Sequence, residues 1–181
     1  GSLSGFVNLH VHSEYSAMDG VSTCKELVKR AGVLGQKAVA LTDHDGLYGA
    51  VDLCENAVSA GVRPIIGCEL RFVLDTAEKV RGWHITALAL TEQGYRNLCD
   101  LVTEAYRPSN FYHHPRVPLS SLLEKQEGLC LLSGCWFGYP GQLYEKALSG
   151  SDSMNTFSEI TSALHGSYGE RFLFELFTGD Y

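Results

Sequence analysis

The chain has 181 residues, of which 45% are hydrophobic and 19% charged, so it can bury a sizeable core and has a globular composition. Its formal net charge is -7 and its sequence pI is about 5.4, and no basic stripe is evident, which argues against a segment that grips DNA by itself. No apolar run approaches the length of a membrane span and no signal peptide opens the chain, so we expect a cytoplasmic protein without a membrane partner.

The chain is expected to form one domain over residues 6–181. Gly1 and Ser2 are typical of a cloning remnant, so residues 1–5 are set apart as an N-terminal lead. Six cysteines are present without a CxxC pair, and without a secretion signal we expect reduced thiols, one of which can serve as a ligand.

The first half of the chain alternates expected strands with expected helices. The strands are 6–12, 37–41 and 64–69. The first helix begins at a capping box formed by Thr23 and Glu26 and ends near Gly35. The second helix ends at Gly61, and its apolar positions are Leu47, Val51, Cys54 and Val58.

The second half continues the same alternation. Strands are expected at 84–90 and 129–133, and a further strand begins at 172–177. Helices are expected at 92–106, 142–148 and 157–165, and the proline-bearing stretch 107–118 is expected to be a loop.

Such alternation predicts an α/β fold with a parallel sheet and right-handed crossovers. Six β/α units fit either a closed barrel or an open doubly wound sheet. Because closed β/α barrels usually need about 250 residues, a barrel built from this chain would lack its last units.

Polar residues that bind metals recur where the expected strands end. In both architectures these ends gather at one rim, where active sites form. His10 and His12 lie two apart on the first strand, so their rings leave the same face. The remaining candidates are Asp19, Asp43, His44, Glu69 and Cys135, together with His84, which opens its strand instead of ending it.

His, Asp, Glu and Cys together suit zinc or manganese better than calcium. Two or more such ions can hold a phosphoryl oxygen and activate water, which is the chemistry of phosphoester hydrolysis. Taken singly, each residue also has a purely structural explanation: His10 and His12 as exposed histidines, Asp43 as a helix cap, Cys135 as a core residue. Their joint occurrence at one rim favours a metal site. Ser13 and Ser133 lack a nucleophile elbow, so a serine hydrolase is rejected.

Several strings resemble the PHP (polymerase and histidinol phosphatase) domain. They are LHVHSEYS from Leu9, MDG from Met18, LTDHDGLYG from Leu41, PIIGCE from Pro64 and LSGC from Leu132. More narrowly, the chain resembles the N-terminal PHP domain of bacterial DNA polymerase III alpha subunits. The run TDHDGLYGAV resembles the error-prone branch, and the likeness covers nearly the whole chain.

The resemblance implies a distorted (β/α)7 barrel with up to three Zn2+ or Mn2+ ions at the strand ends. Asp43 joins the catalytic set as a residue that orients a neighbour. The family's closing Asp-x-His pair is not found before Tyr181, so we expect a barrel incomplete at its C-terminus and fewer ions. The implied ligands are His10, His12, Asp19, His44, Glu69, which would bridge, His84 and Cys135.

The resemblance also implies a function, namely metal-dependent 3′-5′ trimming of DNA as proofreading during replication or translesion synthesis. The expected partners are a DNA 3′ end reached through the parent polymerase, other polymerase domains and replisome subunits. Two alternatives stay open. One is a non-catalytic module that metals stabilise as a scaffold, and the other is a free-standing phosphatase of the histidinol-phosphate type.

Overall fold

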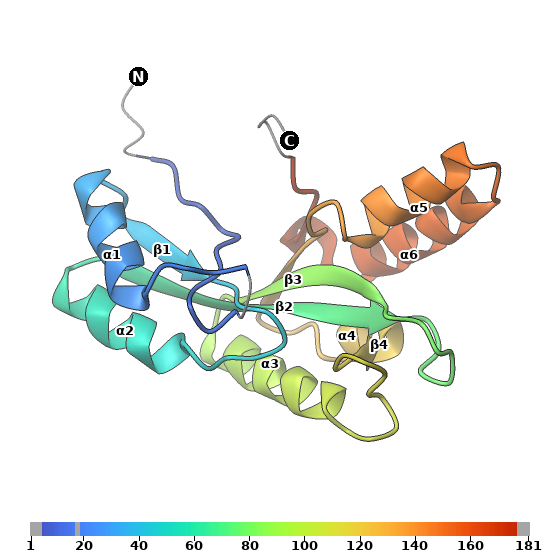
Figure 1. Ribbon diagram of the computed structural model, residues 1–181, viewed down its shortest axis with the longest axis horizontal. Helices are drawn as coiled ribbons and strands as arrows, with labels where there is room; N and C mark the ends of the chain where they lie inside the picture. The colour runs from blue at the N-terminus through green and yellow to red at the C-terminus, as the bar shows by residue number, and fades with distance from the viewer. Residues whose placement is uncertain (1–4, 17–18, 177–181) are drawn as a thin grey trace. The chain divides into compact units, whose positions relative to one another are not determined.

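The computed structural model describes residues 5–16 and 19–176, which form two compact units divided after Glu69 (Figure 1). The first unit contains α1 (Cys24–Val33), β1 (Ala38–Leu41), α2 (Ala50–Ser59) and the start of β2 (Arg63–Val73). β1 pairs with β2 in parallel, with Ala38 opposite Arg63 and Leu41 opposite Ile66. The two helices pack against each other and against β1, around a core that includes Cys24, Val28, Leu41, Leu53 and Ala57.

The predicted capping box at the start of α1 is confirmed. The Thr23 hydroxyl accepts a hydrogen bond from the Glu26 N–H, and the Glu26 carboxylate accepts one from the Thr23 N–H at 2.8 Å. These bonds from Thr23 hold the pKa of Glu26 below its usual value. The helix therefore begins where the sequence predicts, because two backbone donors that the helix cannot satisfy are satisfied by side chains.

The apolar face predicted for α2 is wrong. Val51 and Val58 are 68% and 72% exposed, whereas Leu53 and Ala57 are fully buried with Ala50. Positions 50, 53 and 57 have helical spacing as well, and the two alanines leave room for α2 to lie close to α1 and β1. Close approach of the backbones, rather than the size of the apolar side chain, selects the buried face.

The strand predicted at residues 6–12 is also wrong. The Val11 carbonyl accepts from the Thr42 N–H at 2.8 Å, but the Val11 N–H donates to the Thr42 hydroxyl instead of a backbone carbonyl. Likewise, the His10 N–H donates to the Asn8 side chain. Because side chains take these donors, no ladder continues along the segment, although Thr42 still holds it in place.

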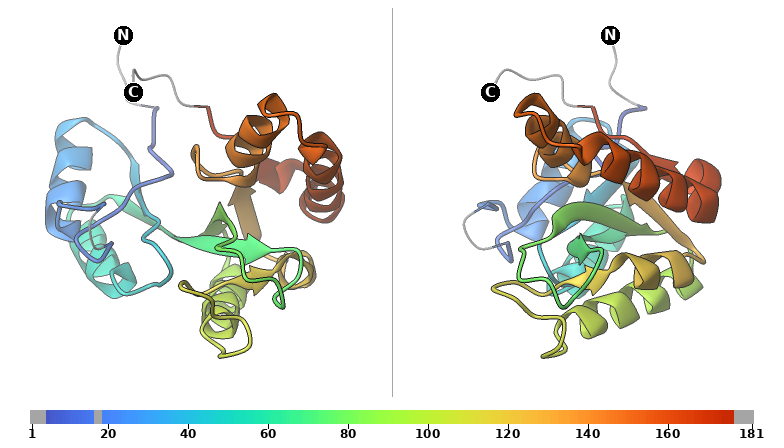
Figure 2. Two further views of the ribbon diagram at one scale, coloured as in Figure 1. Left: turned by 45° about the vertical axis from the view of Figure 1, so that its right-hand side comes forward. Right: turned by 90° about the vertical axis from the view of Figure 1, so that its right-hand side faces the viewer.

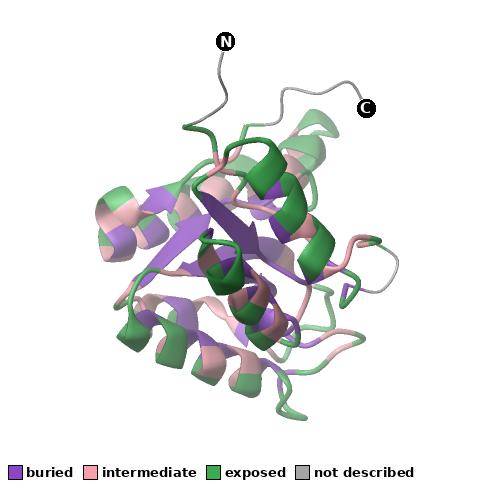
Figure 3. Ribbon diagram, turned by 90° about the vertical axis from the view of Figure 1, so that its left-hand side faces the viewer, coloured by how far each residue is buried: buried purple, intermediate pink, exposed green. Residues whose placement is uncertain are grey.

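The second unit contains the rest of β2, then β3 (Trp83–Ala89), α3 (Glu92–Ala105), β4 (Val117–Pro118), α4 (Leu119–Glu124), β5 (Leu129–Leu132), α5 (Tyr139–Leu148), α6 (Ser153–Tyr168), a 3-10 turn (Gly169–Arg171) and β6 (Phe172–Leu173). Its strands follow the order β2-β3-β5-β6, with β4 paired to β2. α3 packs on β3 and β5, and α5 and α6 lie side by side (Figure 2). The strands are buried along most of their length, whereas the helices alternate buried and exposed positions (Figure 3).

The mixed α/β class is confirmed, and in the described residues the paired strands do not close into a barrel. An all-parallel sheet is wrong, because β3 pairs with β5 antiparallel, with Leu88 opposite Cys130. The connection 74–82 between β2 and β3 contains no helix. A strand that returned parallel to β2 would need a longer crossover connection, so the short one favours a reversal of direction at β3. β6 ends at Leu173, short of the strand expected over 172–177. Position 177 of that prediction lies outside the described residues. The helix α4 was not expected.

A buried arginine fixes that connection. Arg116 is 2% exposed and donates to the backbone carbonyls of Thr76, Glu78, Val80 and Asn110 at 2.6–2.9 Å. Four carbonyl acceptors replace the water that a guanidinium would otherwise bind, so its burial is compensated. In the described part of the chain, no helix combines the length and the apolar character that crossing a bilayer requires.

Candidate metal centre

Two histidines of the first unit converge on one buried carboxylate. Glu69, at 1% exposure, places its Oε2 atom 2.5 Å from His10 Nε2 and 2.9 Å from His12 Nε2. The two imidazole rings lie 5.0 Å apart between centroids. Residues two apart on the extended segment therefore present their rings to the same point, as their spacing predicts.

A third histidine joins this cluster to a second carboxylate. His44 Nε2 lies 2.6 Å from Asp19 Oδ2, and His44 Nδ1 lies 3.4 Å from Glu69 Oε1. The rings of His44 and His12 are 4.2 Å apart between centroids. His44 thus stands between a buried carboxylate and an exposed one, with one ring nitrogen toward each.

Backbone pairing brings His44 and Glu69 together. The Glu69 N–H donates to the Asp43 carbonyl and the Asp45 N–H donates to the Glu69 carbonyl, each at 3.0 Å. His44 follows the end of β1, whereas Glu69 lies inside β2, which continues to Val73, so the expectation that Glu69 ends its strand is wrong. Parallel pairing of β1 with β2, continued by this bridge, brings the two residues side by side.

Within the first unit, the donor atoms form two overlapping groups that could each hold a cation. One consists of His10, His12 and Glu69, and the other of His12, Asp19 and His44, with donor atoms within 4.8 Å of one another. Imidazole and carboxylate donors suit zinc or manganese. A carboxylate as buried as Glu69 also requires positive charge or hydrogen-bond donors beside it. The residues present therefore fit a divalent cation of this kind.

Asp43 faces away from these groups. It is 2% exposed, and its Oδ1 accepts from the Ser13 N–H at 2.6 Å and from the Ser16 hydroxyl at 2.7 Å, while its Oδ2 accepts from the Ser13 hydroxyl at 2.8 Å. The Ser16 oxygen in turn accepts from the His44 N–H at 3.0 Å. Asp43 thus holds the turn between His12 and Asp19 and ties it to His44.

Sequence reasoning missed the part that the two serines play. Ser13 was considered only as a nucleophile, and Ser16 only as a letter of a family string. A serine near a strand end carries no pattern of its own, since its partner lies far along the chain. The signal that could have found them is Asp43. A carboxylate that orients a neighbour needs hydrogen-bond donors around it, and the hydroxyls of nearby serines are such donors.

His84 and Cys135, the other two predicted ligands, lie in the second unit. His84 is buried near the start of β3, and Cys135 is half-buried in the loop after β5. The His84 N–H donates to the Phe137 carbonyl at 3.1 Å, and the Gly138 N–H donates to the Cys135 carbonyl at 2.8 Å. Backbone contacts of Phe137 and Gly138 therefore bring the loop of Cys135 to the start of β3.

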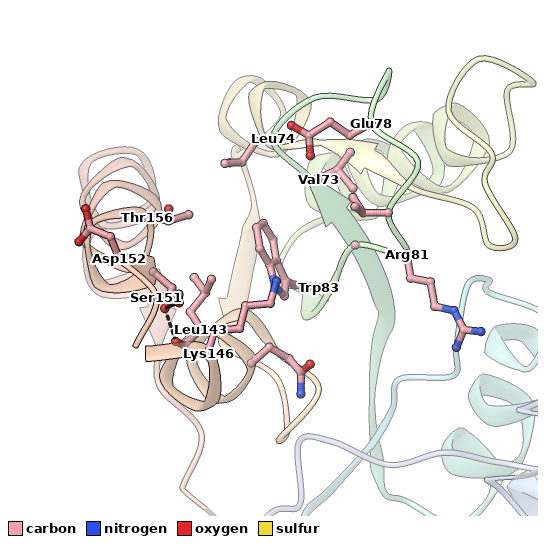
Figure 4. A pocket seen from close by; sticks show the side chains of 14 residues that line it. Val73, Leu74, Glu78, Arg81, Trp83, Leu143, Lys146, Ser151, Asp152 and Thr156 are labelled. Atoms are coloured by element: carbon pink, nitrogen blue, oxygen red, sulfur yellow. Dashed lines mark hydrogen bonds between the residues drawn. The ribbon is translucent and has the colours of Figure 1, made fainter. Parts of the chain in front are cut away.

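The second unit also has a cavity of about 580 Å³ that neither of these two residues lines. Trp83 lines it beside Leu74 and Val73, and Lys146 and Asp152 come from the region of α5 and α6 (Figure 4). Acidic and basic side chains are mixed around it, and none of the predicted ligands lines it. The cavity has no donor set of the kind found in the first unit.

Sequence similarity to known proteins extends over nearly the whole chain. A family model described as the PHP domain matches residues 8–179. The DNA polymerase III subunit alpha of Chlamydia pneumoniae is 42% identical over 137 residues, which are 72% of this chain and 11% of that protein. The DNA polymerase III subunit alpha of Treponema pallidum is 43% identical over 140 residues, which are 74% of this chain and 12% of that protein.

The chain thus spans between 11% and 12% of the length of these two relatives. Among solved structures, a two-domain protein from Bacteroides vulgatus, described as containing a predicted PHP-like metal-dependent phosphoesterase, is 18% identical with a TM-score of 0.45. That alignment covers 70% of this chain and 33% of the other.

Proposed function

Because this chain belongs to the PHP domain family, we propose that residues 6–181 act as one metal-dependent phosphoesterase domain of a bacterial DNA polymerase III alpha subunit. The substrate would be the 3′ end of a DNA strand, trimmed in the 3′-5′ direction during replication or translesion synthesis in the cytoplasm. The error-prone type is the subgroup we favour, from the run that begins at Thr42. DNA, other polymerase domains and replisome subunits would be the partners.

One observation carries this proposal, namely the convergence of His10 and His12 on Glu69 Oε2. We assign His10, His12, Asp19, His44 and Glu69 of the first unit to cation binding, and Glu69 would be the carboxylate that bridges two cations. His84 and Cys135 complete the proposed ligand set. Zinc and manganese are the expected metals.

The contacts of each residue indicate its role in the proposed reaction. Bound divalent cations would supply positive charge for a phosphoryl group and activate water for attack on phosphorus. Glu69 holds two imidazoles at one point, and His44 is held at its backbone by Ser16. Asp43 positions the turn that carries Asp19 and has no role in contact with the substrate, because its oxygens are already occupied by Ser13 and Ser16.

The test uses the intact protein, a 3′-labelled single-stranded DNA and metal analysis of the same preparation. We expect digestion that a chelator stops and that Zn2+ or Mn2+ restores, and a His12→Ala variant that binds less metal and does not digest. His165→Ala, near the end of α6, is the matched control. Digestion that survives both the chelator and His12→Ala would refute the proposal.

The same experiment separates the alternatives. Metal-dependent stability without any digestion would support the non-catalytic scaffold. Turnover of small phosphomonoesters without digestion of DNA would support a phosphatase of the histidinol-phosphate type.

A further inference from the structure

Two exposed tyrosines lie on the loops that carry the proposed ligands. Tyr15 is 44% exposed and falls between His12 and Asp19, and Tyr48 is 66% exposed and follows His44 by four residues. Large aromatic side chains are costly to leave in water when they could be buried. Their exposure beside the one cluster of donor atoms in the first unit calls for a reason.

Each ring rests in space that a glycine leaves open. A Cβ atom added at Gly46 would lie 2.3 Å from Tyr48 Cε2, and one added at Gly49 would lie 3.0 Å from Tyr15 Cδ2. The tyrosine rings therefore lie against glycine backbone, where any other residue would displace them. One side of each ring is supported by the protein, and the rest faces solvent.

The backbones beneath the rings are held by the network that organises the ligands. The Tyr15 N–H donates to the Ser13 hydroxyl at 3.2 Å, and that hydroxyl donates to Asp43. After Tyr48, the Leu53 N–H donates to the Gly49 carbonyl at 2.9 Å and starts α2. The backbone segments that carry the two rings are thus tied to the turns that carry the proposed ligands.

The distance to the cluster suits a nucleotide. Gly46 is two residues from His44, so their Cα atoms are at most about 7 Å apart, and the Tyr48 ring contacts Gly46. The ring edge is then within roughly 11 Å of the His44 backbone, which is about three stacked nucleotides along a strand at about 3.4 Å each. A base near a phosphate held at the cluster can reach Tyr48.

The charge around Tyr15 favours a neutral ligand group. The pKa of Tyr15 is raised, chiefly by the carboxylate of Asp52 and further by partial desolvation and Glu14. A phosphate placed there would be repelled, whereas a nucleobase carries no charge and stacks on an aromatic face whatever its identity.

We propose that Tyr48, assisted by Tyr15, is a stacking platform for a nucleobase within about three nucleotides of the scissile phosphate, which makes the site select nucleic acid over small phosphate esters. This inference rests on the proposed function, because it places the substrate at the same cluster. It adds two residues that bind the base and predicts little preference among the four bases.

The test compares Tyr48→Ala with Tyr48→Phe in the intact protein loaded with Mn2+. We expect Tyr48→Ala to raise KM for single-stranded DNA by about 5- to 150-fold, while kcat and the turnover of glycerophosphocholine, a small diester without an aromatic ring, stay as in the wild type. Tyr48→Phe keeps the ring and should behave as the wild type. Tyr95→Ala removes a tyrosine that is 40% exposed on α3, away from the candidate ligands of the first unit, and is the control.

One further variant and one modified substrate locate the effect. Gly46→Ala displaces the ring without removing it and should reproduce the KM increase. A DNA whose three 3′-terminal nucleotides lack their bases should bind the wild type and Tyr48→Ala equally, because no base within reach of the ring is left to stack. An unchanged KM for DNA in Tyr48→Ala, with turnover of the small diester intact, overturns the inference.

A binding measurement keeps this inference apart from the proposed function. If the wild type hydrolyses neither substrate, the proposed function fails, but the platform is still testable with a DNA that carries 2-aminopurine at its 3′ end. Quenching of that base by the wild type and not by Tyr48→Ala supports stacking. Equal quenching by both proteins refutes it.

Discussion

Replacing Asp43 tests whether this residue positions the proposed metal ligands without binding a cation itself. In Asp43→Ala, three donors lose their acceptor at once, namely the Ser13 N–H and the hydroxyls of Ser13 and Ser16. Both serines are buried, so water cannot easily replace the carboxylate. The two hydroxyls can rotate toward other acceptors, but the backbone N–H cannot.

The expected cost follows from that difference. A buried N–H without a partner costs about 1–3 kcal/mol, and each lost hydroxyl bond about 0.5–1 kcal/mol, so the total is about 3 kcal/mol. For a chain of this length, about 3 kcal/mol lowers Tm by roughly 6–12 °C. Asp43→Asn keeps one oxygen for the N–H, and its amide nitrogen can donate to Ser13, so we expect about 1 kcal/mol, or roughly 2–4 °C.

The assay is thermal unfolding followed by circular dichroism on this chain, with and without chelator, together with metal analysis. Because Ser16 accepts from the His44 N–H, Asp43→Ala should also bind metal more weakly than Asp43→Asn. Equal Tm values for the two variants would refute the reasoning from hydrogen bonds. Loss of turnover in Asp43→Asn at wild-type metal content and Tm would instead make Asp43 a proton-transfer residue.

Three further predictions follow from single residues. His12→Ala removes the donor shared by both proposed groups, so elemental analysis should show a lower metal content than in His165→Ala. Arg116→Met leaves four carbonyls without their donor and should lower the free energy of unfolding in urea by about 3–5 kcal/mol, whereas an exposed arginine such as Arg96 should change it little. The lowered pKa of Glu26 means that its carboxylate stabilises α1 above its ordinary pKa of 4.5, and that this contribution is lost as pH falls through the folded value. The stability difference between wild type and Glu26→Gln, measured by urea unfolding from pH 7 to pH 3, should therefore vanish at the acid end, and a difference that grows there would contradict this.

The cluster of candidate ligands was more predictable than the secondary structure that carries it. His10, His12, His44 and Glu69 could be named as candidates because few residue types bind a cation, although of these four only His44 follows the end of a strand. The segment carrying His10 and His12 needed only to be extended, and it is extended without being a strand. The wrong assignment of a strand still led to the right placement of His10 and His12, because a paired strand and an unpaired extended segment both present alternate residues on one face.

The misassigned elements share a different cause. The face of α2 and the direction of β3 depend on which neighbour packs or pairs with them, and the local pattern does not contain that information. The stretch 74–82 was left without a role in the sequence, yet it is the connection that lets β3 run against β5. A prediction that counts helices between strands would have found this reversal.

The same distinction bears on how the centre should be mutated. Candidate ligands can be recognised in a sequence because few residue types bind a cation. Serine is common in every kind of turn, so the sequence alone does not mark Ser13 and Ser16. Their hydroxyls matter because Asp43 and the His44 N–H lie at hydrogen-bonding distance. Ser16→Ala should therefore weaken metal binding although it changes no proposed ligand. Ser22→Ala is the control from the same loop. It should leave metal binding unchanged, because Ser22 accepts the Glu14 N–H with its backbone carbonyl, which the substitution keeps.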